Sequence, residues 1–279
     1  MLILYKMKKF ILFTILSIFS FSAYADNVSR TIYNSYVNKD MNHWKIIIDS
    51  LQVELEKGNL KVQQKWELLN YQYGYIAWAI SKKKEKKEEA EYYLDIAKDN
   101  LEKLVENSGK TATSNAYSAA FVAYEIGITP FKAPFIGLKS MKYGETAIKQ
   151  DSLNHFALIQ YGNIMNYMPR AFGGSKDKAL VYYKKAKEIM EKDEVLYKEN
   201  WLYMNLILTI ADIYKNKKDY EITKQYYLEA LELEPGYKFV EGLLENLIHK
   251  TPNSKLLTPN FFLKKHLFFQ KKYLPLCRQ

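Results

Sequence analysis

The stretch from Met204 to Pro235, MNLILTIADIYKNKKDYEITKQYYLEALELEP, decides the fold expected for this chain. Bulky and small side chains recur along it at the spacing of one helix face, first at Ile210, Ala211 and Tyr214 and then at Tyr227, Ala230 and Pro235. Because proline cannot continue a helix, the pattern predicts two helices folded back on each other, the second ending at the proline. One such pair cannot bury its apolar faces alone and must stack on neighbours.

The same alternation of bulky and small residues recurs upstream, with altered turns. The three earlier units comprise Leu158, Tyr161, Gly162 and Met165 with Ala179, Tyr183 and Ala186; Gly74 and Trp78 with Ala90, Leu94 and Ala97; and Ala119, Ala120 and Tyr124 with Ser140, Gly144 and Ala147. Small residues let two helix backbones approach closely where they cross. Four units exceed the minimum of about three that a stable stack requires.

The rest of the body is also predicted to be helical, since few prolines and glycines interrupt it and no strand-like alternation appears. Asp219 is expected to cap one helix and Pro235 with Gly236 to end it. The predicted helices are 28–37, 41–56, 60–81, 85–107, 113–127, 135–150, 153–167, 175–192, 198–216, 219–234 and 236–249.

These large, small and breaker positions resemble those of the tetratricopeptide (TPR) unit of about 34 residues. From Trp44 to Leu247 the chain also resembles a group of uncharacterised exported bacterial TPR proteins, and more distantly the T-component of TRAP transporters. The resemblance to the exported bacterial TPR proteins is carried by the pair Lys139-Ser140 and by the turn with Pro169, Phe172, Gly173, Gly174, Lys178 and Ala179. The resemblance implies an all-α, TPR-like superhelical array of antiparallel helix pairs in the cell envelope, and it implies no particular activity.

Residues 1–25 are predicted to be a secretory signal peptide, with Lys8 and Lys9 before an apolar run and cleavage after Ala25. The alternative, a membrane anchor, needs ~20 apolar residues, whereas this run has roughly 12. Translation starts at Met1 or Met7. The expected location is the periplasm, with residues 26–249 forming one helical repeat domain.

Residues 250–279 form a basic, aromatic tail, expected to be disordered or to contact an anionic membrane surface through its Phe and Lys residues. The whole chain has a formal net charge of +10, yet residues 26–249 hold 31 basic and 31 acidic residues. A nucleic-acid-binding domain needs a net basic excess, so the neutral body argues against nucleic acid as a partner.

The turn from Pro169 to Ser175 is the first candidate site. Gly173 and Gly174 before a helix, with Arg170 beside them and Phe172 between, would suit an anion. Alternatively, the glycines only make a tight turn and Ser175 caps the helix. The second enlarged turn, TPFKAPFIG, adds Lys132 and Phe135 to the candidates for partner or ligand binding.

Aromatic side chains are abundant and suggest a lined groove. Tyr75 and Trp78 share one helix, and Tyr182 precedes Tyr183 so that only one of this pair can occupy the core. We therefore include Tyr75, Trp78 and Tyr182 among the candidate binding residues. Ordinary packing of a helical repeat would also use aromatics at fixed positions.

No catalytic residue, cofactor or metal is predicted, because the four histidines lack ligand spacing and no known nucleophile or phosphate-loop motif appears. We expect a non-enzymatic scaffold or adaptor that binds a protein or peptide through its concave surface. The alternative is a small-solute-binding or transport accessory protein. A closed cavity near Phe131, Phe135 and Phe172 would favour the alternative, and an open groove the scaffold.

Overall fold

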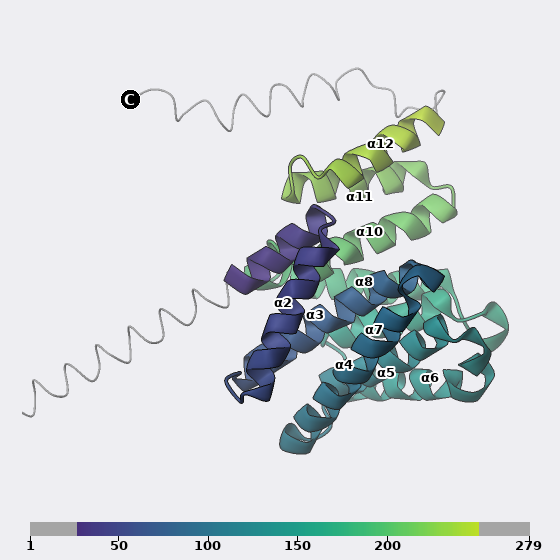
Figure 1. Ribbon diagram of the computed structural model, residues 1–279. Helices are drawn as coiled ribbons and strands as arrows, with labels where there is room; N and C mark the ends of the chain where they lie inside the picture. The colour runs from purple at the N-terminus through teal and green to yellow at the C-terminus, as the bar shows by residue number, and fades with distance from the viewer. Residues whose placement is uncertain (1–26, 251–279) are drawn as a thin grey trace, which may run out of the picture.

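The computed structural model describes residues 27–250, and these form helices joined by short turns (Figure 1). No strand occurs in this range, which confirms the prediction of an all-α fold. The predicted signal peptide and the tail lie outside the described residues. The helices are 27–37, α2 Met41–Glu56, α3 Val62–Ser81, α4 Lys87–Ser108, α5 Ala112–Ile128, α6 Ala133–Gln150, α7 His155–Tyr167, α8 Lys176–Met190, α9 Glu194–Tyr197, α10 Trp201–Asn216, α11 Tyr220–Leu233 and α12 Lys238–Lys250, with short 3-10 helices η1 Lys83–Lys86, η2 Pro130–Lys132 and η3 Arg170–Phe172.

The four predicted units are the four helix pairs with the most extensive mutual contact, namely α3 with α4, α5 with α6, α7 with α8, and α10 with α11. Successive pairs also touch each other, through α4 and α5, α6 and α7, and α8 and α10. Each hairpin therefore buries its apolar faces partly against its own partner helix and partly against the next hairpin, as the sequence requires.

Small residues lie at the helix crossings, as predicted. Ala211 of α10 and Ala230 of α11 are fully buried. A Cβ added at Gly162 of α7 would meet the ring of Tyr183 in α8 at 2.6 Å. That distance is too short for any side chain, so the absence of a side chain at Gly162 is what admits the tyrosine ring.

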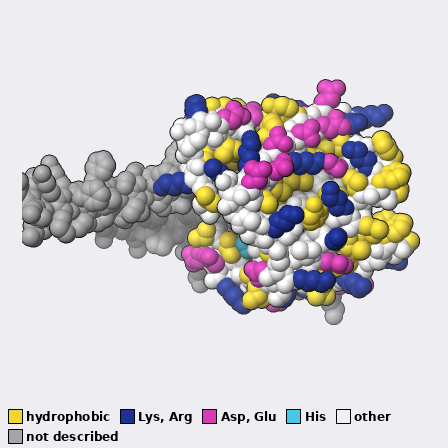
Figure 2. Space-filling view, turned by 90° about the horizontal axis from the view of Figure 1, so that it is seen from below, with side chains coloured by type: hydrophobic (Ala, Val, Ile, Leu, Met, Phe, Trp, Pro, Cys, Tyr) yellow, Lys and Arg dark blue, Asp and Glu magenta, His cyan; other side chains and the backbone are white. Residues whose placement is uncertain are grey.

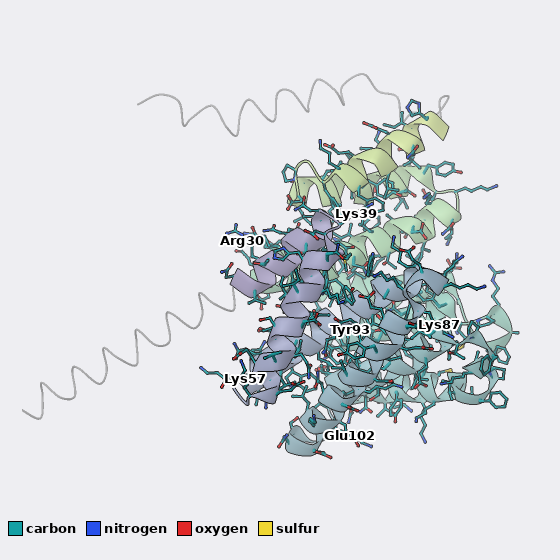
Figure 3. All side chains as sticks on the ribbon, in the orientation of Figure 1. Arg30, Lys39, Lys57, Lys87, Tyr93 and Glu102 are labelled. Atoms are coloured by element: carbon teal, nitrogen blue, oxygen red, sulfur yellow. The ribbon has the colours of Figure 1, made fainter. Side chains whose placement is uncertain are left out.

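The first helices of the chain lie against the last ones. Trp201 of α10 donates its indole N–H to the side-chain oxygen of Asn70 in α3 at 2.9 Å. The ammonium of Lys39, just before α2, lies 3.5 Å from the centre of the Phe239 ring in α12, and Figure 3 places Lys39 beside that helix. These contacts fix the N-terminal helices over α10 and α12.

Local capping follows the sequence closely. The carboxylate of Asp219 accepts the amide hydrogen of Ile222, which confirms the predicted cap of α11. The sequence did not predict α9 or the three 3-10 helices, all of which lie in segments taken as turns or as parts of longer helices. Each spans four residues or fewer and leaves no periodic pattern to detect.

Candidate binding surfaces

An open depression of about 490 Å³ lies along α10, and we call it the inner cleft. A polar row on α10 faces it, and aromatic side chains from other helices stand around that row. Asp212 and Asn216 are exposed to solvent, while Asn205 and Thr209 are partly buried. The polar row comprises Asn205, Thr209, Asp212 and Asn216, and the aromatic residues are Tyr36, Tyr167, Tyr227 and Phe239.

The periodicity of α10 explains why these polar groups face one way. Their spacing of four, three and four residues repeats one face of a helix. The opposite face carries buried Leu206, Ile207 and Ile210, which pack in the core. The helix is thus held by its apolar face and presents amide, hydroxyl and carboxylate groups to the cleft.

Hydrogen bonds orient the polar row. The hydroxyl of Tyr36 donates to the side-chain oxygen of Asn205 at 3.3 Å, and the side-chain amide of Asn216 donates to the carboxylate of Asp212 at 3.0 Å. Thr209 donates to the backbone carbonyl of Asn205 at 2.8 Å. These bonds restrict the side-chain directions, and each of the four side chains retains unused hydrogen-bonding groups.

The phenols of the inner cleft are held in their neutral form. Burial raises the pKa of Tyr36 well above its usual value, and the nearby Tyr237 adds to the shift. Burial also raises the pKa of Tyr227, with a further contribution from the Asp212 carboxylate. A phenol is already neutral at pH 7, and the raised pKa values keep both hydroxyls protonated at higher pH as well.

The outer cleft, of about 560 Å³, is an open depression lined by residues of α6, α7, α8 and η3. It holds three of the residues predicted from sequence, Phe172, Gly173 and Tyr182. The ring of Tyr182 meets Tyr161 edge-on, with ring centres 4.7 Å apart. Its neighbour Tyr183 is fully buried, so the pair divides between surface and core as predicted.

The turn after α7 is held by its own hydrogen bonds. The amide hydrogens of Gly173 and Gly174 bond to the carbonyls of Arg170 and Pro169, and that of Ser175 bonds to Met165 at 2.7 Å. The Ser175 hydroxyl accepts the amide hydrogen of Lys178, which confirms it as the cap of α8. The amides that an anion would need are thus engaged in the turn.

Both glycines of that turn have a conformational reason. Gly173 has a φ of +97°, in the left-handed region that side chains disfavour. A Cβ at Gly174 would lie 1.8 Å from the carbonyl oxygen of Met168. Neighbouring Arg170 is exposed on η3. The turn geometry alone therefore accounts for the Gly-Gly pair.

The remaining candidates do not join either cleft. Lys132 and Phe135 are exposed where η2 leads into α6. Tyr75 is buried and donates its hydroxyl to Glu89 of α4. Trp78 packs on Tyr75 with ring centres 5.2 Å apart. The last two residues belong to the contact between α3 and α4.

The polar row of the inner cleft was missed in the sequence. Its signal is present, because WLYMNLILTIADIYKN carries Asn205, Thr209, Asp212 and Asn216 at helical spacing within an otherwise apolar helix. Identifying the cleft also required Tyr36 and Phe239, which reach α10 only through the packing of the first and last helices. No local pattern encodes that packing.

Comparison of the sequence with protein-family models and with curated proteins finds no match. Between residues 27 and 250, no three or more His, Cys, Asp or Glu side chains gather in a way that could hold a metal ion. Within the same range, every helix is too short or too polar to cross a bilayer.

Proposed function

We propose that this protein is a non-catalytic, TPR-like scaffold, exported to the periplasm, that binds an extended peptide segment of a partner protein in the inner cleft. The polar row of α10 is the observation that carries the proposal. The stacked helix pairs with small residues at their crossings support a TPR-like superhelical array. The predicted signal peptide supports export.

The dimensions of the polar row suit an extended chain. At about 1.5 Å per residue of helix, Asn205 and Asn216 are ~16 Å apart along α10. An extended peptide advances ~3.3 Å per residue, so about five of its residues would lie along the row. Side-chain amides and a hydroxyl can pair with its backbone N–H and C=O groups, while the surrounding aromatic rings contact its side chains.

The surroundings of the enlarged turns favour a scaffold over a small-solute carrier. Phe131 and Phe135 are exposed and line neither cleft, and the outer cleft that Phe172 lines is open rather than enclosed. The inner cleft is likewise open, with Asp212 and Asn216 at its exposed edge. An open, elongated surface suits a segment of a larger molecule better than a solute that must be surrounded.

Affinity capture from envelope extracts, followed by mass spectrometry, tests the proposal. The wild-type protein is used as one bait, and the triple variant Thr209→Ala, Asp212→Ala, Asn216→Ala as a second. A matched control replaces Asp95, Asp99 and Glu102 by Ala, which are exposed at similar helical spacing on α4; Figure 3 places Glu102 far from α12. We expect a protein retained by the wild type and the control and lost from the cleft variant. Identical captured proteins for all three baits would rule out the inner cleft as the binding surface.

A further inference from the structure

One edge of the molecule exposes an unusual row of large apolar side chains. Phe131, Phe135 and Leu138 follow one another at helical spacing along η2 and α6, and they are 76%, 84% and 68% exposed. Phe172 of η3 is 69% exposed. Since Met141 of α6 and Phe172 line the same outer cleft, η3 lies beside the row. We call this surface the apolar edge.

The side chains around the apolar edge are basic. Residues 130–142 and 169–173, which supply it, contain four Lys or Arg and no Asp or Glu, and the nearest acidic residues along the chain are Glu125, Glu145 and Asp177. Lys132, Lys139 and Lys142 form no salt bridge within residues 27–250. Because the domain as a whole is formally neutral, this positive charge is local. Figure 2 shows hydrophobic side chains with Lys and Arg among them on the side of the molecule where α6 lies.

Arg170 extends the basic surface on η3. Its positive charge contributes to lowering the pKa of Asp177, after the larger effect of Lys217, to which Asp177 is paired. Asp177 therefore already has a salt-bridge partner in Lys217, the residue that follows α10. The Arg170 guanidinium remains available to a negatively charged group outside the protein.

The backbone holds these side chains outward. Pro130 begins η2 and Pro134 lies in the first turn of α6, where each fixes its φ angle at a helix start. On the neighbouring turn, the backbone hydrogen bonds of Gly173 and Gly174 to Arg170 and Pro169 hold η3. The apolar edge thus lies on two turns, one constrained by proline and the other by its own hydrogen bonds.

We propose that the apolar edge binds the surface of an anionic lipid bilayer, with Phe131, Phe135, Leu138 and Phe172 in the interface and Lys132, Lys139, Lys142 and Arg170 against lipid headgroups. Apolar side chains that enter the acyl boundary, together with cations that meet anionic headgroups, give reversible surface binding. Phe131, Phe135 and Leu138 project beyond the fold and line neither cleft, while Phe172 is largely exposed beside the outer cleft that it lines. Side chains that project in this way can enter the interface of a bilayer. The inference is independent of the inner cleft, which lies along α10.

A local probe tests this contact in the full chain, whose basic tail could bind vesicles by itself. Cys277 is replaced by Ser, and an environment-sensitive nitrobenzoxadiazole dye is attached at Leu138→Cys. The control carries the dye at Val195→Cys on α9, a residue 79% exposed that follows the far end of α8. Vesicles of phosphatidylglycerol and phosphatidylcholine are compared with vesicles of phosphatidylcholine alone.

We expect the dye at position 138 to shift its emission to the blue and to be quenched by spin-labelled acyl chains, only with the anionic vesicles. The dye at position 195 should stay in water even if the tail holds the chain to the vesicle. Lys132→Glu with Lys139→Glu should weaken vesicle binding measured at position 138 by about tenfold or more, because each cation near an anionic surface contributes.

Three results would overturn the inference: no shift at position 138 with anionic vesicles, equal shifts at positions 138 and 195, or equal binding of both vesicle types. If the dye at position 138 shows no shift with anionic vesicles, the apolar edge would instead be assigned to binding an acidic protein surface. The triple variant of the inner cleft should bind vesicles like the wild type, so failure of one proposal leaves the other standing.

Discussion

Gly74 of α3 lies directly under the indole ring of Trp201 in α10. A Cβ placed at Gly74 would come within 2.8 Å of that ring and, equally, within 2.8 Å of the Trp44 ring in α2. The two tryptophans meet edge-on there, with ring centres 5.2 Å apart. The absence of a side chain at Gly74 thus makes room for one tryptophan from α2 and one from α10. At this contact the first helices pack against the later ones.

Gly74→Ala is expected to destabilise the protein. Alanine in a helix interior normally stabilises by roughly 0.5–1 kcal/mol relative to glycine. The overlap with two buried rings should cost ~1–3 kcal/mol and therefore outweigh that gain. Urea unfolding followed by circular dichroism measures the difference. Gly137→Ala in α6 is the control, because a Cβ there meets nothing within 4 Å, and it should leave stability unchanged or raised. A stabilised Gly74→Ala variant would contradict the close contact.

Overpacking a crossing within one hairpin should have a similar effect. Ala211→Leu or Ala230→Leu introduces a larger side chain where α10 meets α11 and both alanines are fully buried. We expect each to lower stability by ~1–3 kcal/mol, read as a lower melting temperature. Ala77→Leu on the exposed face of α3 provides the comparison. Equal melting temperatures for all three variants would show that the crossing is not tightly packed.

Tyr73 joins two hairpins through a buried hydrogen-bond network. Its hydroxyl accepts hydrogen bonds from the side-chain amides of Gln160 at 2.9 Å and Asn163 at 3.3 Å, both on α7. Tyr73→Phe keeps the ring and leaves these amides short of a partner, so we expect a loss of ~1–3 kcal/mol. Tyr92→Phe is the control, since Tyr92 is exposed. Equal unfolding free energies for the two variants would refute a stabilising role for the network.

The hairpins were predictable because their determinants are local. Alternating bulky and small residues such as Tyr183 and Ala186 repeat within one hairpin, and a single helix periodicity reveals them. Gly74 marks the limit of that approach. The sequence pattern assigned Gly74 correctly to its repeat unit. The residues that Gly74 contacts, however, are Trp44 of α2 and Trp201 of α10, which lie outside that unit. Only the packing of the first helices on α10 brings those rings together.

The two clefts also differ in how far they could be predicted from the sequence. Phe172, Gly173 and Tyr182 could be selected from turn composition and aromatic pairing, and they do share the outer cleft. The inner cleft depends on Tyr36 reaching Asn205 from the helix at 27–37. A contact between residues so distant in the sequence has no periodic signature, which is why the polar row went unrecognised.

High pH should unfold the protein through its buried tyrosines. Burial is the largest cause that raises the pKa of Tyr73, Tyr117 and Tyr124 above the ordinary value of 10.0. These three rings form one cluster, with Tyr73 and Tyr124 stacked at 5.3 Å between ring centres. In the unfolded chain the same phenols ionise near pH 10.

The sign of the effect follows from proton linkage. Above pH 10 the unfolded state loses phenolic protons that the folded state keeps, so the free energy of unfolding falls as pH rises toward the folded pKa. Well below pH 10 this contribution is fully present. Urea titrations at pH 8, 9.5 and 11 should therefore show a small loss of stability between the first two and a larger drop at the third.

Tyr117→Phe isolates the tyrosine share of that drop from the deprotonation of lysines. The variant removes one buried phenol and its hydrogen bond from Asn70, so it should be less stable than the wild type at pH 8. Between pH 9.5 and 11, however, it should lose less stability, because one fewer phenol is released on unfolding. Because exposed tyrosines ionise near pH 10 in any case, the informative signal is the difference in phenolate absorbance between the wild type and Tyr117→Phe, which should rise together with loss of helical circular dichroism. An identical pH dependence in the variant, or phenolate absorbance from these rings before any helix is lost, would mean that the cluster is open to water.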